Sequence, residues 1–287
     1  MDLNENRPLC PDVTTGVVLF HGLTGMPSEM RPVAKHLTKL GCKVECPLLP
    51  GHGAGHKELL ATGWKDWVAG AKQSLENFAK ECDHVVVGGL SMGALLALLC
   101  ALEEPKVSGV VLLSPTLHYD SRNSNTWKQH MLFLIDFLPF LGDWFWWTEE
   151  PPYGLKDERL QRIITKSIEA AQRGESTDFG NFRTYSGSLR QLHHLVAATR
   201  KQARRLAVPA LIMHSMEDSL TSIKNATEMC DLMTSNEKTL IILSGCDHVL
   251  TLDLRKRDVA NYVGNFVIKA SWDQQQRSKK LTTSSSV

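Results

Sequence analysis

The chain has 287 residues, of which 43% are hydrophobic and 22% charged, and its formal net charge is +1. These values are ordinary for a globular protein and suit one large domain or a domain with an insertion. Basic residues are scattered along the chain, so the sequence gives no electrostatic footprint for nucleic acid.

Cysteine usage and the apolar stretches point to an intracellular protein. The seven cysteines form no CxxC pair, which argues against a disulfide framework. No signal peptide is recognisable at the start. The most apolar stretch, 131–147, is interrupted by charged residues, proline and glycine, so it is not a transmembrane helix. We therefore expect a cytoplasmic location.

Short apolar runs alternate with helical patterns, as in a parallel α/β sheet. The expected elements of the first half are strand 16–20, helix 28–40, strand 43–47, helix 64–80, strand 84–88, helix 92–102 and strand 107–113. Residues 117–206 show only helical pattern and loops, which exceeds ordinary loop lengths. The alternation then resumes with strand 207–213, helix 223–233, strand 238–243 and helix 258–270.

This order predicts an α/β fold with a mostly parallel sheet flanked by helices. Residues 15–116 and 207–270 are expected to form the core, and 117–206 a helical cap insertion. The tail 271–287 is rich in Gln, Ser and Thr, and we expect it to be disordered.

The sequence Gly89-Leu90-Ser91-Met92-Gly93 lies between a β-branched run and an Ala/Leu-rich helix. This is the strand–turn–helix setting of a nucleophile elbow, in which glycines let strand and helix approach closely around a strained serine. The turn would place the hydroxyl at the start of a helix, where N–H groups favour developing negative charge. Ser91 is therefore the predicted nucleophile.

A serine nucleophile needs a base, and the base needs an orienting acid. In elbow hydrolases these follow in the order Ser, Asp or Glu, His. Asp218 comes just after the strand near 210–213, and His248 just after the last strand. Both would lie at the carboxyl edge of the sheet, so they are the predicted acid and base.

The oxyanion formed in acyl transfer needs backbone donors that are already in place. One is expected to be the N–H of Met92, directly after the nucleophile. The other is expected from Leu23, in the loop His21-Gly22-Leu23-Thr24-Gly25 after the first strand.

These segments, together with Pro50-Gly51-His52-Gly53, Met216-Glu217-Asp218 and Gly245-Cys246-Asp247-His248, resemble those of bacterial carboxylesterases and monoacylglycerol lipases of the α/β-hydrolase superfamily. The resemblance covers about residues 15 to 270 and is loosest in the insertion. It implies a triad of Ser91, Asp218 and His248, with oxyanion donors at Leu23 and Met92. No cofactor or metal is implied.

Several residues compete for these roles. Glu217 and Asp247 lie beside the predicted acid and base, but Asp247 is expected to be solvated and to point away from the base. His21 is expected to hold its loop through a hydrogen bond. The remaining candidates are expected to be structural or loop residues, namely His52, His56, Ser114 and Cys246.

The aromatic stretch 127–147 is interpreted as cap packing, part of which would line an acyl pocket or touch a lipid surface. The predicted function is hydrolysis of acyl esters, with monoacylglycerols among the candidate substrates and a lipid surface as the candidate partner. A thioesterase or acyltransferase would use the same residues. A non-catalytic binding module is the alternative from another class.

Overall fold

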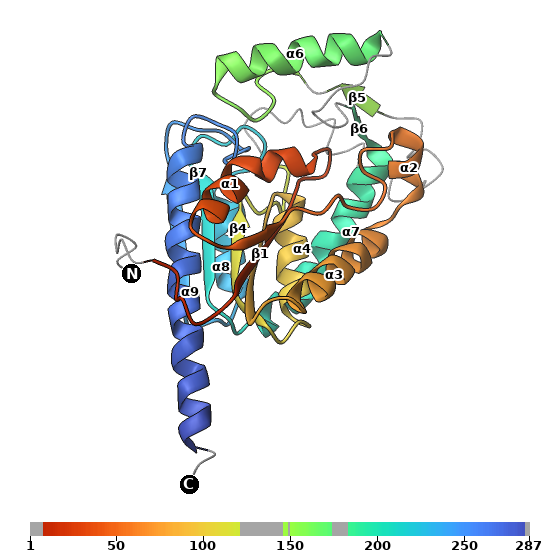
Figure 1. Ribbon diagram of the computed structural model, residues 1–287. Helices are drawn as coiled ribbons and strands as arrows, with labels where there is room; N and C mark the ends of the chain where they lie inside the picture. The colour runs from red at the N-terminus through yellow and green to blue at the C-terminus, as the bar shows by residue number, and fades with distance from the viewer. Residues whose placement is uncertain (1–7, 121–145, 149, 174–182, 285–287) are drawn as a thin grey trace.

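The computed structural model describes residues 8–120, 146–148, 150–173 and 183–284. Its centre is a six-stranded sheet with the order β2-β1-β3-β4-β7-β8, in which every neighbouring pair is parallel (Figure 1). The strands are β1 (Thr15–Phe20), β2 (Lys43–Glu45), β3 (His84–Leu90), β4 (Val107–Leu113), β7 (Ala210–Ser215) and β8 (Lys238–Leu243).

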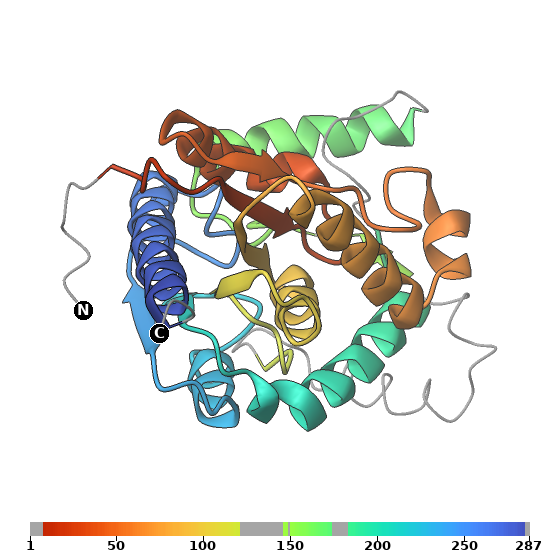
Figure 2. The same ribbon diagram turned by 60° about the horizontal axis from the view of Figure 1, so that its bottom comes forward.

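Helices cover both faces of this sheet (Figure 2). Two hydrophobic clusters form the core, one with α3, α4, α7 and α8 and the other with α1 and α9. Alternate residues of β1 point into opposite clusters, since Val18 and Phe20 belong to the first and Val17 and Leu19 to the second. These helices are α1 (Arg31–Lys39), α3 (Trp64–Ala79), α4 (Met92–Ala101), α7 (Ser186–Gln202), α8 (Lys224–Leu232) and α9 (Lys256–Ser284).

The predicted fold class is thus confirmed, and most element bounds agree within a few residues. Strands β4 and β8 have the predicted bounds. Strand β7 begins at Ala210 rather than residue 207, because Pro209 has no N–H to donate to a neighbouring strand. The expected helix 28–40 is divided into a short 3-10 helix, η1 (Pro27–Met30), and α1.

The segment expected to form a cap is less uniform than the sequence suggested. It contains a two-stranded antiparallel sheet of β5 (Trp146–Thr148) and β6 (Arg183–Tyr185), and helix α6 (Glu158–Gln172). Helix α7 packs on the core instead, with Leu189, Leu192 and Leu195 in the cluster that holds α3 and α4. Residues 121–145, which include most of the aromatic stretch, lie outside the described residues.

The tail was wrongly predicted to be disordered from residue 271, because α9 continues to Ser284. The start of this tail, at residues 271 and 272 of α9, forms hydrogen bonds with the N-terminal segment. Cys10 N–H donates to Ser271 Oγ at 3.2 Å, and Trp272 Nε1–H donates to Pro8 O at 3.0 Å. A polar segment with several good helix formers among its residues, here Gln, Arg, Lys and Leu, can thus remain helical when its first residues gain tertiary contacts.

None of the helices in the described ranges combines the length and the apolar character that a bilayer span requires.

Candidate active site

The carboxyl ends of four adjacent strands are joined by backbone hydrogen bonds just beyond the strands. Ser91 N–H donates to Leu113 O at 2.9 Å, and Ser114 N–H donates to Met213 O at 2.8 Å. Met216 N–H continues the row to Leu243 O at 2.8 Å. The loops that follow β3, β4, β7 and β8 therefore start at one level, at the edge where parallel sheets bind ligands.

Ser91 occupies a sharp turn between β3 and α4. Its φ of 56° and ψ of −115° are unusual for a residue with a side chain. Two glycines make the turn possible. A Cβ on Gly93 would lie 2.2 Å from Phe20 O, and one on Gly89 would lie 2.2 Å from the backbone of Gly93. The glycines of the motif thus allow β1, β3 and α4 to meet closely around the serine.

The loops after β7 and β8 bring Asp218 and His248 together. His248 Nδ1 lies 2.7 Å from Asp218 Oδ2, and the side chains are 6% and 1% exposed. Nδ1–H donates to the carboxylate in this pair, which leaves Nε2 without a proton in the neutral imidazole. An imidazole held in this way can accept a proton from a serine hydroxyl.

The Asp218 carboxylate is held by its own loop. Oδ1 accepts hydrogen bonds from Leu220 N–H at 2.8 Å and Thr221 N–H at 2.7 Å, and Oδ2 accepts one from Thr221 Oγ1 at 3.0 Å. Burial alone would raise the pKa of Asp218, but the charge and hydrogen bond of His248 and these donors lower it. Asp218 is therefore ionised at neutral pH.

His214 lies on the other side of this carboxylate. Its Nε2 is 3.1 Å from Thr221 O and 3.4 Å from Asp218 Oδ2, and its side chain is fully buried. Burial lowers the pKa of His214, so it is neutral beside the carboxylate. Sequence reasoning missed both His214 and Thr221. The three-residue spacing from Asp218 to Thr221, typical of a local turn, is a signal that would have suggested the second.

The pKa of His248 predicts the pH dependence of hydrolysis. Burial would lower this pKa, but the Asp218 charge and hydrogen bond raise it above its ordinary value of 6.5. Because only the neutral imidazole can accept a proton, kcat/KM for an ester is expected to rise with pH, with a midpoint above 6.5. A pH series of kcat/KM measures this midpoint. A midpoint below 6.5 would contradict the expected coupling to Asp218.

The competing carboxylates have other contacts. Glu217 forms an ion pair with Lys156 and its side chain is 39% exposed. Asp247 was expected to be solvated, but the structure shows that it is buried. Its Oδ1 accepts hydrogen bonds from Ser219 N–H at 2.6 Å and from its neighbour His248 N–H at 2.7 Å, which replace those to water. Asp247 thus holds together the backbones of the two loops that carry Asp218 and His248.

The loop that carries Leu23 is fixed by two histidines. His21 Nε2 accepts Leu49 N–H at 3.2 Å, so its Nδ1–H donates to Gly22 O at 2.9 Å. Burial lowers the pKa of His21 to about 3, which keeps it neutral. His52 Nε2 lies 2.8 Å from Leu23 O. Both histidines therefore have the structural roles expected from the sequence, and the Leu23 backbone is held in place.

Two further features concern the backbones of Leu23 and Met92, the predicted oxyanion donors. The Glu29 carboxylate accepts Gly22 N–H at 3.1 Å, which anchors the Leu23 loop to η1. Met92 is the first residue of α4, and the first N–H groups of a helix have no acceptor within it. The helix dipole adds positive potential at this end. Met92 N–H is therefore free of helical bonding beside Ser91.

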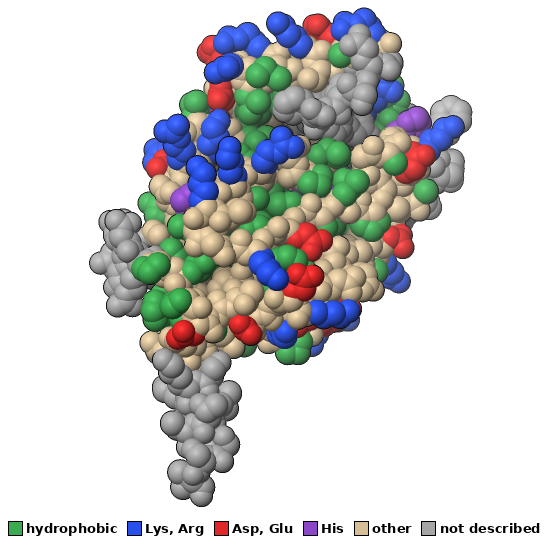
Figure 3. All heavy atoms as spheres, in the orientation of Figure 1, with side chains coloured by type: hydrophobic (Ala, Val, Ile, Leu, Met, Phe, Trp, Pro, Cys, Tyr) green, Lys and Arg blue, Asp and Glu red, His purple; other side chains and the backbone are tan. Residues whose placement is uncertain are grey.

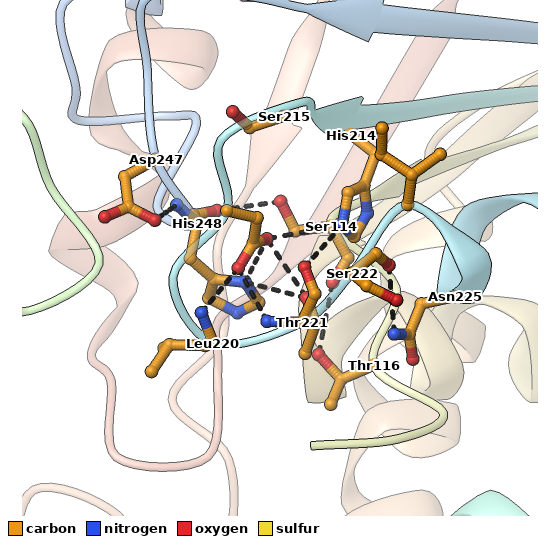
Figure 4. Close-up of polar contacts among 12 residues, drawn as sticks. Ser114, Thr116, His214, Ser215, Leu220, Thr221, Ser222, Asn225, Asp247 and His248 are labelled. Atoms are coloured by element: carbon orange, nitrogen blue, oxygen red, sulfur yellow. Dashed lines mark hydrogen bonds and ion pairs between the residues drawn. The ribbon is translucent and has the colours of Figure 1, made fainter. Parts of the chain in front are cut away.

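The hydroxyl of Ser91 has a partner that the sequence did not predict. Thr116, in the loop after β4, places Oγ1 at 2.9 Å from Ser91 Oγ and at 3.2 Å from Ser114 O. Ser114 Oγ in turn donates to His248 O at 2.7 Å. Figure 4 shows Ser114 and Thr116 on the loop beside His248. The loop after β4 thus contacts both the serine and the histidine segments.

Replacement of Thr116 by valine is expected to lower kcat/KM for ester hydrolysis about fivefold. Valine keeps the shape but loses the hydroxyl that orients Ser91 Oγ, and one neutral hydrogen bond contributes about 1 kcal/mol. Steady-state kinetics measure the loss. Thr116→Ser is the matched control, since it keeps the hydroxyl and should stay near wild type. A Thr116→Val enzyme with unchanged kcat/KM would refute this role.

His56 and Cys246, two further candidates, have other surroundings. The His56 ring stacks on Tyr185 with centroids 5.7 Å apart. Cys246 is buried, and burial raises the pKa of its thiol, which makes it a poor nucleophile. Across the described part of the chain, no three His, Cys, Asp or Glu side chains gather as metal ligands would.

Comparison with known proteins places the chain among hydrolases. It is 29% identical over 249 residues to a thermostable monoacylglycerol lipase of Bacillus sp. (strain H-257), covering 87% of this chain and 86% of that protein. It is 23% identical over 257 residues to a carboxylesterase of Bacillus subtilis (strain 168), covering 89% of this chain and 93% of that protein.

Solved structures show the same fold. A structure described under "LipS and LipT, two metagenome-derived lipolytic enzymes" has a TM-score of 0.73 at 25% identity and covers 90% of this chain and 96% of its own. A monoglyceride lipase variant of Saccharomyces cerevisiae has a TM-score of 0.74 at 16% identity, covering 92% and 89%. The family model for serine aminopeptidase, S33, matches residues 11–255. The chain therefore belongs to the serine aminopeptidase S33 family of α/β-hydrolases.

Proposed function

We propose that this protein hydrolyses carboxylic esters through an acyl-enzyme on Ser91. The observation that carries the proposal is the buried 2.7 Å pair of His248 and Asp218, at the same sheet edge as a serine held in a strained turn. This combination supplies a nucleophile, a base and an ionised acid. The names of the bacterial relatives, a monoacylglycerol lipase and a carboxylesterase, support esters as the substrate.

In the proposed reaction, Ser91 Oγ attacks the ester carbonyl while His248 Nε2 takes its proton. Asp218 holds the imidazolium that forms. The N–H groups of Leu23 and Met92 stabilise the oxyanion, where a single donor typically contributes about 3–4 kcal/mol. The alcohol leaves with the proton from His248. Water then attacks the acyl-enzyme while His248 takes a proton from it, and Ser91 Oγ receives that proton as the acid is released.

Substrate class is tested with four groups of compounds: p-nitrophenyl esters of increasing acyl length, monoacylglycerols, acyl-CoA thioesters and aminoacyl p-nitroanilides. We expect hydrolysis of the esters, with monoacylglycerols among the substrates. Faster cleavage of thioesters would favour the thioesterase alternative. Cleavage of the anilides without the esters would overturn the proposal in favour of an aminopeptidase, the activity in the family's name.

A further inference from the structure

A basic groove lies between α1 and the first turns of α9. It has a volume of about 580 Å³, which is within the range of small-molecule sites. Figure 3 shows Lys and Arg side chains gathered over this part of the molecule. The polar residues that line the groove are Lys35, His36, Lys39, Lys256, Arg257 and Asn261, and none of them is acidic.

The positive charge of the groove is largely uncompensated. Among the ion pairs of the described residues, none includes Lys35, Lys39 or Arg257. The Lys256 ammonium has a carboxylate partner only at 3.8 Å, in Asp157. A protein with a formal net charge of +1 thus places four cations around a single hollow.

The helices add to this positive potential. Both α1 and α9 begin beside the groove, and α1 has no acidic residue in its first turn. The first turn of helix α9 contains two cations, Lys256 and Arg257, and one carboxylate, Asp258, which is paired with Arg255. Cations near helix N-termini are unfavourable, whereas an anion there is stabilised. His36 and Lys39 lie in the last turn of α1, where a cation is favourable, but Lys256 and Arg257 lie at a helix start, where a bound anion would offset their unfavourable charge.

The groove is held open by packed helices. His36 contacts α9 at Gly264, where a Cβ would lie 2.9 Å from the imidazole Nε2. Below it, Val33 and Leu37 of α1 and Val263 of α9 are buried in one cluster. The groove is thus formed before a ligand binds, which lowers the entropic cost of binding.

Both walls of the groove connect directly to the candidate active site. Helix α1 follows η1, whose Glu29 carboxylate accepts Gly22 N–H in the Leu23 loop. Helix α9 follows the segment in which Asp253 Oδ2 accepts Asp247 N–H, next to His248. The two helices that line the groove are therefore linked, through the segments that precede them, to the loops that carry the proposed oxyanion donor and base.

We propose that this groove is a binding site for a phosphate group. Arg257 offers a planar fork that matches phosphate oxygens, and the lysines add mobile point charges. Most of the exposed lining of the groove is apolar, with Pro32 and Ala260 among its residues, and this surface would contact the remainder of the ligand. The phosphate would come from a soluble phosphate ester or from an anionic phospholipid surface. The site is separate from ester cleavage, so it stands or falls independently of the proposed function.

Binding is measured with the full chain in two arms. Calorimetric titration with glycerol 3-phosphate detects a soluble source, and co-sedimentation with phosphatidylcholine vesicles, with or without phosphatidylglycerol, detects a lipid surface. We expect Lys35→Glu/Arg257→Glu to weaken binding at least about tenfold in the arm where wild type binds. Lys35→Gln/Arg257→Gln should show a smaller loss, and thermal unfolding verifies that each variant is folded.

The matched control is Lys201→Glu/Arg204→Glu, which makes the same charge change at exposed positions on α7 and just after it. It should bind like wild type. Binding in either arm that is lost only in the groove variants supports the site and identifies the source of the phosphate. An equal loss in the control would show a general effect of net charge and overturn the proposal. Absence of wild-type binding in both arms would also overturn it.

Discussion

Ser91→Ala is expected to lower kcat for ester hydrolysis by about 10⁶-fold, the scale of losing the nucleophile in a serine hydrolase. Alanine removes the only atom that forms the acyl bond, while the Gly89 and Gly93 contacts that shape the turn remain. Residual hydrolysis would come from the proposed oxyanion donors alone. The measurement is single-turnover kinetics on a p-nitrophenyl ester, together with labelling by a fluorophosphonate probe.

Ser188→Ala is the matched control for this variant. Ser188 lies in α7, and its buried hydroxyl has no hydrogen-bond partner among the described residues. Replacement by a strong helix former should leave both labelling and kcat unchanged. If the Ser91→Ala protein were folded and still labelled or hydrolysed esters at the wild-type rate, the nucleophile would be another residue.

Asp218→Asn is expected to lower kcat by about 10⁴-fold with little change in KM. The amide is nearly isosteric but cannot stabilise the His248 imidazolium. It can also present its NH₂ group to Nδ1, which would leave the proton on Nε2 and the base in the wrong tautomer. Steady-state kinetics measure the loss, and near-ultraviolet circular dichroism verifies the packing of the buried site.

Glu217→Gln tests the competing acid by the same chemical change one residue earlier. Its side chain is partly exposed and paired with Lys156, and such pairs contribute little. We expect kcat within about twofold of wild type. The reverse pattern, with a large loss in Glu217→Gln and little in Asp218→Asn, would move the acid to Glu217.

The sheet could be predicted from the sequence, and the five proposed site residues could be named from it, because both inferences depend on local patterns. Glycines flank Ser91 within two residues, and Asp218 and His248 each follow a strand whose apolar character is clear. The parallel order of strands then brings their carboxyl ends to one edge. Spacing along the chain therefore carries most of the information about the predicted triad.

Contacts between distant segments could not be predicted in this way. Thr116 has no local signature, and it contacts Ser91 only because β4 lies next to β3 in the sheet. The basic groove is similar, since Lys35 and Arg257 are scattered charges until α1 packs on α9. Helix α7 was assigned to the cap because a helical pattern does not reveal which neighbour its apolar side contacts.

The backbone hydrogen bonds beyond the strand ends also have a consequence for the local stability of the candidate active site. The amides of Ser91, Ser114 and Met216 each donate to the neighbouring strand, so they can exchange with deuterium only when adjacent strands separate. Helix α6, whose buried residues Ile164 and Ile168 form a small cluster with Leu155, can open at lower cost. Slow exchange at the three amides and faster exchange in α6 would show that the proposed catalytic residues are carried by a more stable part of the molecule than α6.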